Sequence, residues 1–161
     1  MSQFWQYAIS KLKQLQGSPH SIALGCAFGA AISFTPFIGL HTFLSCFLTW
    51  IFNGNILAAT IGTLIGNPWT FPFIWIAVYY TGQYLISGTI TTINHTEFYE
   101  LFKNSTHALL SFDFSNFSSD IWPVFYPMLI GCIPFSIAVW IISYYTIKHT
   151  LNTLTNNRNK I

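Results

Sequence analysis

Apolar residues dominate a long central part of the chain, where Asp, Glu, Lys and Arg are absent between Lys13 and Glu97. Two apolar segments fill this stretch, Ile22–Phe52 and Ile56–Ser87, and a third runs from Ile121 to Ile147. At 1.5 Å per residue, one straight helix over the first segment would be about 46 Å long, against a hydrocarbon core of about 30 Å. The pattern therefore predicts an all-α, polytopic helical membrane protein with broken or re-entrant transmembrane helices.

Prolines interrupt the first two apolar segments. Pro36 lies inside the first segment, and Pro68 and Pro72 lie inside the second. A proline within a helix removes a backbone donor, and its ring clashes with the preceding turn. We therefore expect helix breaks at these prolines, with Gly39 as part of the first break. Because only Asn53-Gly54-Asn55 separates the two segments, the breaks should lie close together.

Small residues recur every four positions ahead of each break. They are Ser21, Gly25, Gly29 and Ser33 in the first segment, and Ala58, Gly62 and Gly66 in the second. Such stripes let helix backbones approach closely within lipid, where apolar side chains gain nothing by leaving their surroundings. We therefore expect the four glycines to be helix-packing positions. The shared arrangement also indicates a weak internal repeat.

The remaining segments divide the chain into five parts. Residues 1–17 are predicted to form an amphipathic helix in the bilayer interface, or a helix packed on the protein's own surface. Residues 18–88 form the membrane domain of two broken segments, and residues 89–120 an amphipathic helix with an extramembrane loop. A C-terminal transmembrane helix is expected over 121–147, followed by a polar tail over 148–161 that we expect to be disordered.

Charge narrows the class and sets an orientation. Only 6% of the residues are charged, against about 25% in an average soluble domain, so the lipid bilayer is the expected surrounding. The net charge of +2 is too small to indicate nucleic-acid binding. The two ends of the chain carry five of the six basic residues, whereas the loop from Gly88 to Asp120 holds one Lys and all four acidic residues. By the positive-inside rule, both termini are expected in the cytoplasm.

Three polar residues are candidates for binding a ligand. His41 is the one histidine within the first two apolar segments, and Asn67 and Thr70 flank the second break. Ionisable groups inside a membrane usually have a function. The alternative is structural, because these side chains can satisfy backbone groups freed by the prolines. No catalytic motif, cofactor motif or metal-ligand spacing occurs, and the three cysteines are interpreted as buried free thiols.

Several short motifs together carry a resemblance to a known family. They are Ser18-Pro19 followed by Ile22-Ala23-Leu24-Gly25, Pro36 with Gly39-Leu40-His41-Thr42, Asn55, Gly62-Thr63, and the Asn-Pro-x-Thr-x-Pro motif at residues 67–72. The stretch that contains them resembles a family of bacterial membrane proteins, domain of unknown function 2062. The resemblance implies an integral protein of the bacterial inner membrane. Some family members look fused to glycosyltransferase-like domains, whereas the family's frequent Gln after Gly-Leu is His41 here.

The leading hypothesis is that the two broken segments form a small transport or permeation unit. The alternative is an accessory or scaffold protein for enzymes of envelope lipids or glycans. A lipid-modifying enzyme is a third possibility, which would need a cluster of polar groups that the sequence does not display. A homo-oligomer or another membrane protein is the expected partner.

Overall fold

The computed structural model describes residues 17–37, 39–67, 69–88, 103 and 122–158. These residues form five α-helices and one 3-10 helix: α2 (Pro19–Ile32), α3 (His41–Ile51), α4 (Ile56–Gly62), η1 (Thr63–Ile65), α5 (Phe71–Ser87) and α7 (Trp122–Arg158). No strand occurs in this part of the chain, so the all-α prediction is confirmed for it. The predicted helices within residues 1–17 and 89–120 lie almost entirely outside the described residues.

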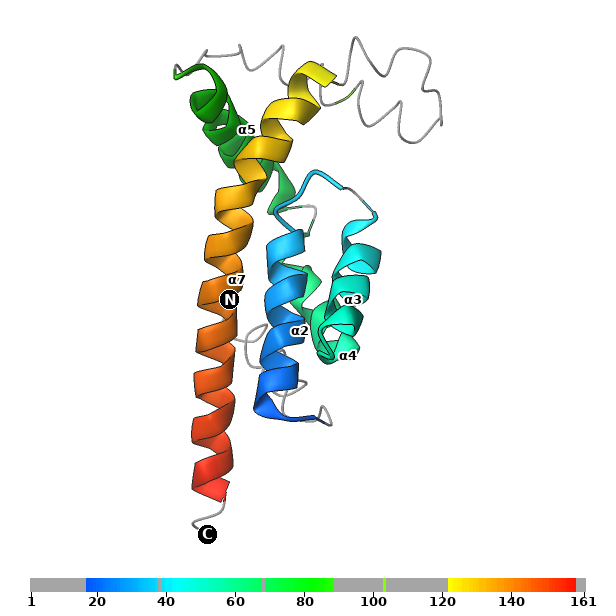
Figure 1. The fold of residues 1–161 in the computed structure, drawn as a ribbon, viewed down its shortest axis with the longest axis vertical. Coiled ribbons are helices and arrows are strands. Elements are labelled where there is room, and N and C mark those ends of the chain that lie inside the picture. The colour runs from blue at the N-terminus through cyan, green and yellow to red at the C-terminus, as the bar shows by residue number, and fades with distance from the viewer. Residues whose placement is uncertain (1–16, 38, 68, 89–102, 104–121, 159–161) are drawn as a thin grey trace.

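Helices α2 and α5 pack against the long helix α7, while α3 and α4 pack on the side of α2 that faces away from α7 (Figure 1). Helix α2 runs antiparallel to the C-terminal half of α7, since His20 contacts Tyr144 at one end and Ala31 contacts Ser136 at the other. Helix α3 returns alongside α2, and α4 then runs back past it. Helix α5 leaves this group and packs on the N-terminal half of α7.

Helix α2 begins and ends as its sequence predicts. Ser18 is the N-cap, and its side chain accepts a hydrogen bond from the Ser21 N–H at 3.2 Å, while Pro19 takes the first helical position. The helix ends at Ile32, four residues ahead of Pro36, which is buried in the turn that follows. Gly39 has φ +77° in the same turn, a conformation that L side chains rarely adopt. The first predicted break is therefore a turn between two separate helices.

The second break lies between η1 and α5. Asn55 caps α4 by accepting a hydrogen bond from the Ala58 N–H at 2.9 Å, and the helix tightens into η1 before it ends. Helix α5 begins at Phe71 with Pro72 in its second position. A proline is tolerated there because the first N–H groups of a helix have no partner within it. Pro72 thus starts a helix, whereas Pro68 lies outside the described residues.

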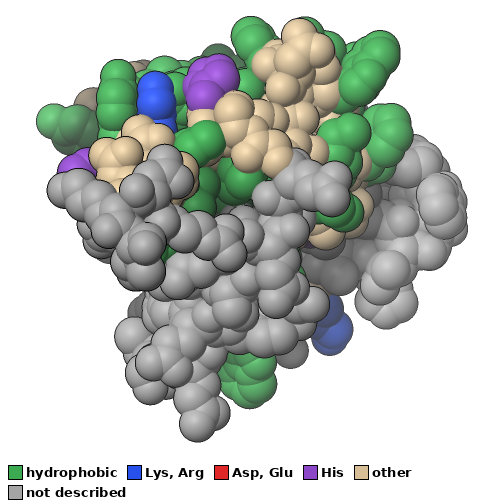
Figure 2. Space-filling model, turned by 90° about the horizontal axis from the view of Figure 1, so that it is seen from below, with side chains coloured by type: hydrophobic (Ala, Val, Ile, Leu, Met, Phe, Trp, Pro, Cys, Tyr) green, Lys and Arg blue, Asp and Glu red, His purple; other side chains and the backbone are tan. Residues whose placement is uncertain are grey.

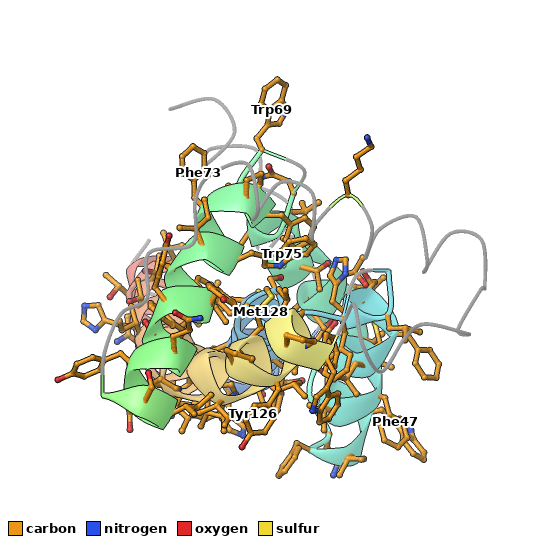
Figure 3. All side chains as sticks on the ribbon, turned by 90° about the horizontal axis from the view of Figure 1, so that it is seen from above. Phe47, Trp69, Phe73, Trp75, Tyr126 and Met128 are labelled. Carbon is orange, nitrogen blue, oxygen red and sulfur yellow. The ribbon has the colours of Figure 1, made fainter. Side chains whose placement is uncertain are left out.

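Close contact between backbones holds the helices together at two crossings. A Cβ built at Gly25 or Gly29 of α2 would overlap a backbone oxygen of the segment that contains α4, and one at Gly62 would lie 2.5 Å from the Cys26 oxygen. The α5–α7 crossing uses Gly82 and Gly131 in the same way. Around this second crossing, Trp75 and Met128 belong to one cluster of buried apolar side chains (Figure 3).

Helix α7 is longer than the sequence pattern predicts. It continues through Pro127 and Pro134 and beyond residue 147 to Arg158, so the expected disorder of the tail is wrong for residues 148–158. Ile147 and Leu151 explain the extension, because both pack against buried residues of α2 and α4. Among the described residues, α7 is the one helix long and apolar enough to cross a membrane, judged by length and composition. The prediction of several crossings stays a prediction.

Helix α3 has an unusual distribution of side chains. It buries Ser45 and Thr49 against its neighbours and exposes Phe43 (71%), Phe47 (45%) and Trp50 (65%). The three exposed aromatic side chains share one face of the helix, at spacings of four and three residues. A helix in contact with water would be expected to turn these side chains inward and the hydroxyls outward.

Candidate functional site

The turns that follow α2 and η1 lie against each other, and we call the two together the break junction (residues 33–37, 39–41, 66, 67 and 69–71). The Ser33 hydroxyl donates to the Gly29 carbonyl at 2.9 Å and lies 3.4 Å from the Thr63 carbonyl oxygen. A Cβ built at Gly66 would lie 2.8 Å from the Ser33 Cβ. The rings of His41 and Phe71 meet edge to face, with centroids 5.6 Å apart.

Asn67 and Thr70 satisfy each other and the backbone around them. The Asn67 Oδ1 accepts from the N–H groups of Trp69 and Thr70 at 3.0 and 3.1 Å, and its Nδ2 donates to the Leu64 carbonyl at 3.3 Å. The Thr70 hydroxyl lies 2.6 Å from the Ile65 carbonyl, to which it donates, and accepts from the Asn67 N–H at 3.0 Å. These bonds replace the helical hydrogen bonds lost at the turn. They match the structural interpretation of the two residues.

His41 differs from both. Its backbone N–H donates to the Phe37 carbonyl at 3.0 Å, which closes the turn at the start of α3. Its ring is half-buried, and Nδ1 is buried with no hydrogen-bond partner among the described residues. A buried polar atom without a partner costs about 1–3 kcal/mol. The structure therefore leaves His41 as the polar side chain of the junction whose hydrogen-bonding capacity is not used within the described chain.

The break junction lies beside the middle of the apolar part of α7. Ser136 donates to the Ala31 carbonyl at 3.0 Å, and the Phe34 and Phe135 rings stack with centroids 6.1 Å apart. Ser136 stands about halfway between Tyr126 and Tyr144, two of the aromatic residues that flank this apolar stretch. The two turns therefore meet beside the middle of α7, which is the one long apolar helix among the described residues.

Metal binding and cysteine chemistry find no support in the described residues. No group of three or more His, Cys, Asp or Glu side chains that could hold a metal ion occurs there. Cys26 and Cys132 are buried free thiols that donate to carbonyl groups of Ala58 and Leu129, at 3.3 and 3.2 Å. Cys46 is a free thiol on α3.

Sequence reasoning missed two features of the structure. One is the close crossing of α5 and α7 at Gly82 and Gly131. The sequence signal for it was a glycine among large apolar residues in each of the two segments. The other is a polar cluster of His20, Tyr144 and Lys148, formed by residues 124 and 4 positions apart in the chain. Lys148 stood out as the first charge after the third apolar segment, but nothing in the pattern indicated that α2 would meet it.

Comparison with known proteins gives one match. A family model described as "Uncharacterized protein conserved in bacteria (DUF2062)" matches residues 2–160. No curated protein and no solved structure matches the chain. The match extends over nearly the whole chain, beyond the stretch whose motifs carried the resemblance. The chain therefore belongs to the DUF2062 family of uncharacterised conserved bacterial proteins.

Proposed function

We propose that the chain is an integral membrane protein with two crossings and one re-entrant hairpin. Helices α2 and α3, of 14 and 11 residues, rise about 21 and 16 Å, and neither spans a hydrocarbon core of about 30 Å. Together they form the hairpin, which enters and leaves on one side. The α4–η1–α5 segment supplies a broken crossing, and α7 supplies a continuous one.

The exposed surface supports this placement. The outer face of α3 carries Phe and Trp side chains, and Trp69 and Phe73, at the start of α5, are 86% and 76% exposed. Figure 3 shows Phe47, Trp69 and Phe73 directed away from the packed helices. Water would penalise each exposed aromatic side chain, whereas lipid would not. Large exposed apolar areas are typical of surfaces that meet membranes or protein partners.

Within this placement, we propose that the break junction is the working site of a small transport or permeation unit. The observation that carries the proposal is the meeting of two helix breaks halfway along α7, with the buried Nδ1 of His41 lacking a partner among the described residues. Many secondary transporters bind their substrate near the bilayer midplane, where discontinuous helices meet. Histidine exchanges protons near neutral pH, so the expected cargo is a proton or a solute that moves with one.

An accessory or scaffold role is the second candidate, and a different observation favours it. The side chains of Asn67 and Thr70 both make local hydrogen bonds to the backbone, which leaves little polar lining at the second turn. The exposed aromatic face of α3 (Phe43, Phe47 and Trp50) would then bind a membrane-spanning partner rather than lipid alone. This role requires no flux through the chain.

Proton uptake into proteoliposomes separates the two roles. The purified full chain is reconstituted, a potassium diffusion potential is imposed, and a pH-sensitive dye inside the vesicles reports proton entry. We expect entry above that of protein-free vesicles for the natural chain, and its loss in His41→Phe. His149→Phe, on the exposed surface of α7, is the matched control and should retain entry. Entry no faster than in empty vesicles would contradict proton permeation through the chain and favour the accessory role.

A further inference from the structure

A second polar cluster lies where α2 begins beside α7, well away from the break junction. The His20 Nδ1 lies 2.7 Å from the Tyr144 hydroxyl, and the Lys148 ammonium donates to the same hydroxyl at 3.1 Å. The Lys148 Nζ is also 5.2 Å from the centre of the Tyr144 ring. One tyrosine oxygen thus holds a histidine from α2 and a lysine from α7 together.

The hydrogen-bond directions leave donors unused. The Tyr144 hydroxyl can accept from Lys148 and at the same time donate its own hydrogen to the His20 Nδ1. With the bond in this direction, the ring proton of a neutral His20 lies on Nε2. Lys148 uses one of its three N–H groups in this contact. The His20 Nε2–H and two N–H groups of Lys148 therefore have no acceptor among the described residues.

Aromatic rings hold the cluster in place, and the part of the chain that the structure describes adds no negative charge to it. The Tyr144 ring stacks on Trp140 with centroids 5.2 Å apart, and the rings of Tyr144 and Tyr145 meet edge to face with centroids 5.3 Å apart. All four acidic residues of the chain lie at positions 97 to 120, outside the described residues. Figure 2, which looks at the molecule from this end, shows basic and histidine side chains and no acidic one among its coloured atoms.

The position suits a membrane surface. Lys148 is the first charged residue after the third apolar segment, and the aromatic side chains beside it are of the kind that gathers at the headgroup level. The cluster also lies at the start of α2, the end at which a helix carries partial positive charge. Side-chain donors, an ammonium group with no acidic partner among the described residues and a helix N-terminus therefore lie together at this end of α2.

We propose that His20, Tyr144 and Lys148 bind the phosphate group of an anionic phospholipid in the cytoplasmic leaflet. The Lys148 ammonium supplies the charge, the His20 Nε2–H supplies a directed donor, and Tyr144 fixes the two at a set separation. Phosphate oxygens are strong acceptors of charge-assisted hydrogen bonds, and anionic lipids attract basic side chains at the membrane surface. The inference rests on the proposed membrane placement and is independent of any flux through His41.

Native mass spectrometry of the full chain in detergent tests this proposal. The protein is titrated with phosphatidylglycerol and, separately, with zwitterionic phosphatidylcholine, and bound lipids are counted. We expect phosphatidylglycerol to bind more tightly, and Lys148→Met to weaken that binding about five- to tenfold, as expected for the loss of one cation at an anionic surface. Tyr144→Phe, which keeps the ring and removes the oxygen, should weaken it as well, while Lys148→Arg should retain it.

Two controls make the result decisive. His149→Ala removes an exposed neighbour of Lys148 and should leave the preference unchanged, and His41→Phe should abolish flux without affecting lipid binding. Inorganic phosphate is tested in the same way. If it binds as tightly as the lipid and Lys148→Met weakens its binding equally, the cluster binds phosphate, but the natural ligand is a soluble phosphate and not a lipid. Equal binding of the two lipids by the natural chain, or equal binding by Lys148→Met and His149→Ala, would overturn the proposal.

Discussion

Replacement of Gly29 by leucine tests whether the contact between α2 and α4 determines stability. A Cβ at this position would overlap the Ala59 carbonyl oxygen and lie 2.8 Å from the Thr63 nitrogen, while ordinary contacts begin at 3.4 Å. All of these are backbone atoms, so no side chain can rotate away. The helices would have to separate by at least about 0.6 Å even before the rest of the leucine is accommodated.

Overpacking of a close contact typically costs about 1–3 kcal/mol, and a whole leucine should reach the upper end of that range. For a chain of this size, a loss of about 3 kcal/mol corresponds to a fall of roughly 6–12 °C in Tm. Thermal unfolding of the purified protein in detergent, followed by the exposure of its buried thiols, would measure this shift.

The control is Ala138→Leu, which places the same side chain on an exposed part of α7 and should shift Tm by no more than about 2 °C. If Gly29→Leu unfolds at the same temperature as this control, α2 and α4 are not in backbone contact. That result would refute both the interpretation of the small-residue stripe and the packing of the hairpin against α4.

Two further substitutions test hydrogen bonds at the break junction and between α2 and α7. Thr70→Val keeps the shape of the side chain but removes its bonds to Ile65 and Asn67, so we expect a loss of about 1–3 kcal/mol in unfolding free energy. Thr70→Ser keeps the hydroxyl and should retain most of that free energy. A Val variant as stable as the natural chain would contradict the capping role. Ser136→Ala leaves the Ala31 carbonyl without its partner and should cost about 1 kcal/mol. Denaturant titration measures both, and an effect below about 0.3 kcal/mol for Ser136→Ala would show that this bond does not hold α2 to α7.

The sequence predicted the breaks because proline chemistry is local. The ring of Pro36 and its missing N–H disfavour a continuation of α2, and Gly39 allows the turn that follows. A proline alone does not decide the outcome, since α7 continues through Pro127 and Pro134. The periodic glycines similarly indicated that Gly29 and Gly62 can approach a neighbouring backbone. The meeting of the two breaks followed from the short link of residues 53–55 between the segments.

Features that depend on which helix packs on which were beyond the sequence pattern. The continuation of α7 past residue 147 is stabilised by Leu151 and Ile147 against α2 and α4, a contact between distant parts of the chain. The cluster at His20 likewise needs α2 and α7 to lie antiparallel at one particular register. Periodicity reports which face of a helix is apolar but does not identify its neighbour. The same limit applied to Gly82 and Gly131.

The site was predicted in part. The sequence identified His41, Asn67 and Thr70 as the polar residues beside the breaks, and all three lie at the break junction. The sequence did not show which of the three side chains serves only to satisfy backbone groups at the turns. Hydrogen-bond geometry separates them, because Asn67 and Thr70 bind each other whereas the Nδ1 of His41 has no partner among the described residues. Whether His41 moves a proton stays a prediction.

Site-directed cysteine labelling from the two sides of the membrane tests the central proposal, a re-entrant α2–α3 hairpin beside two crossings. The three cysteines are first replaced by alanine, and single cysteines are placed at Ser18, Phe52, Ser87 and Asn156, all exposed. A membrane-impermeant maleimide is applied to right-side-out and inverted vesicles. We expect the cysteines at Ser18, Phe52 and Asn156 to react from the cytoplasmic side and the one at Ser87 from the opposite side. Labelling of Phe52 from the side opposite Ser18, or of all four positions from one side, would contradict it.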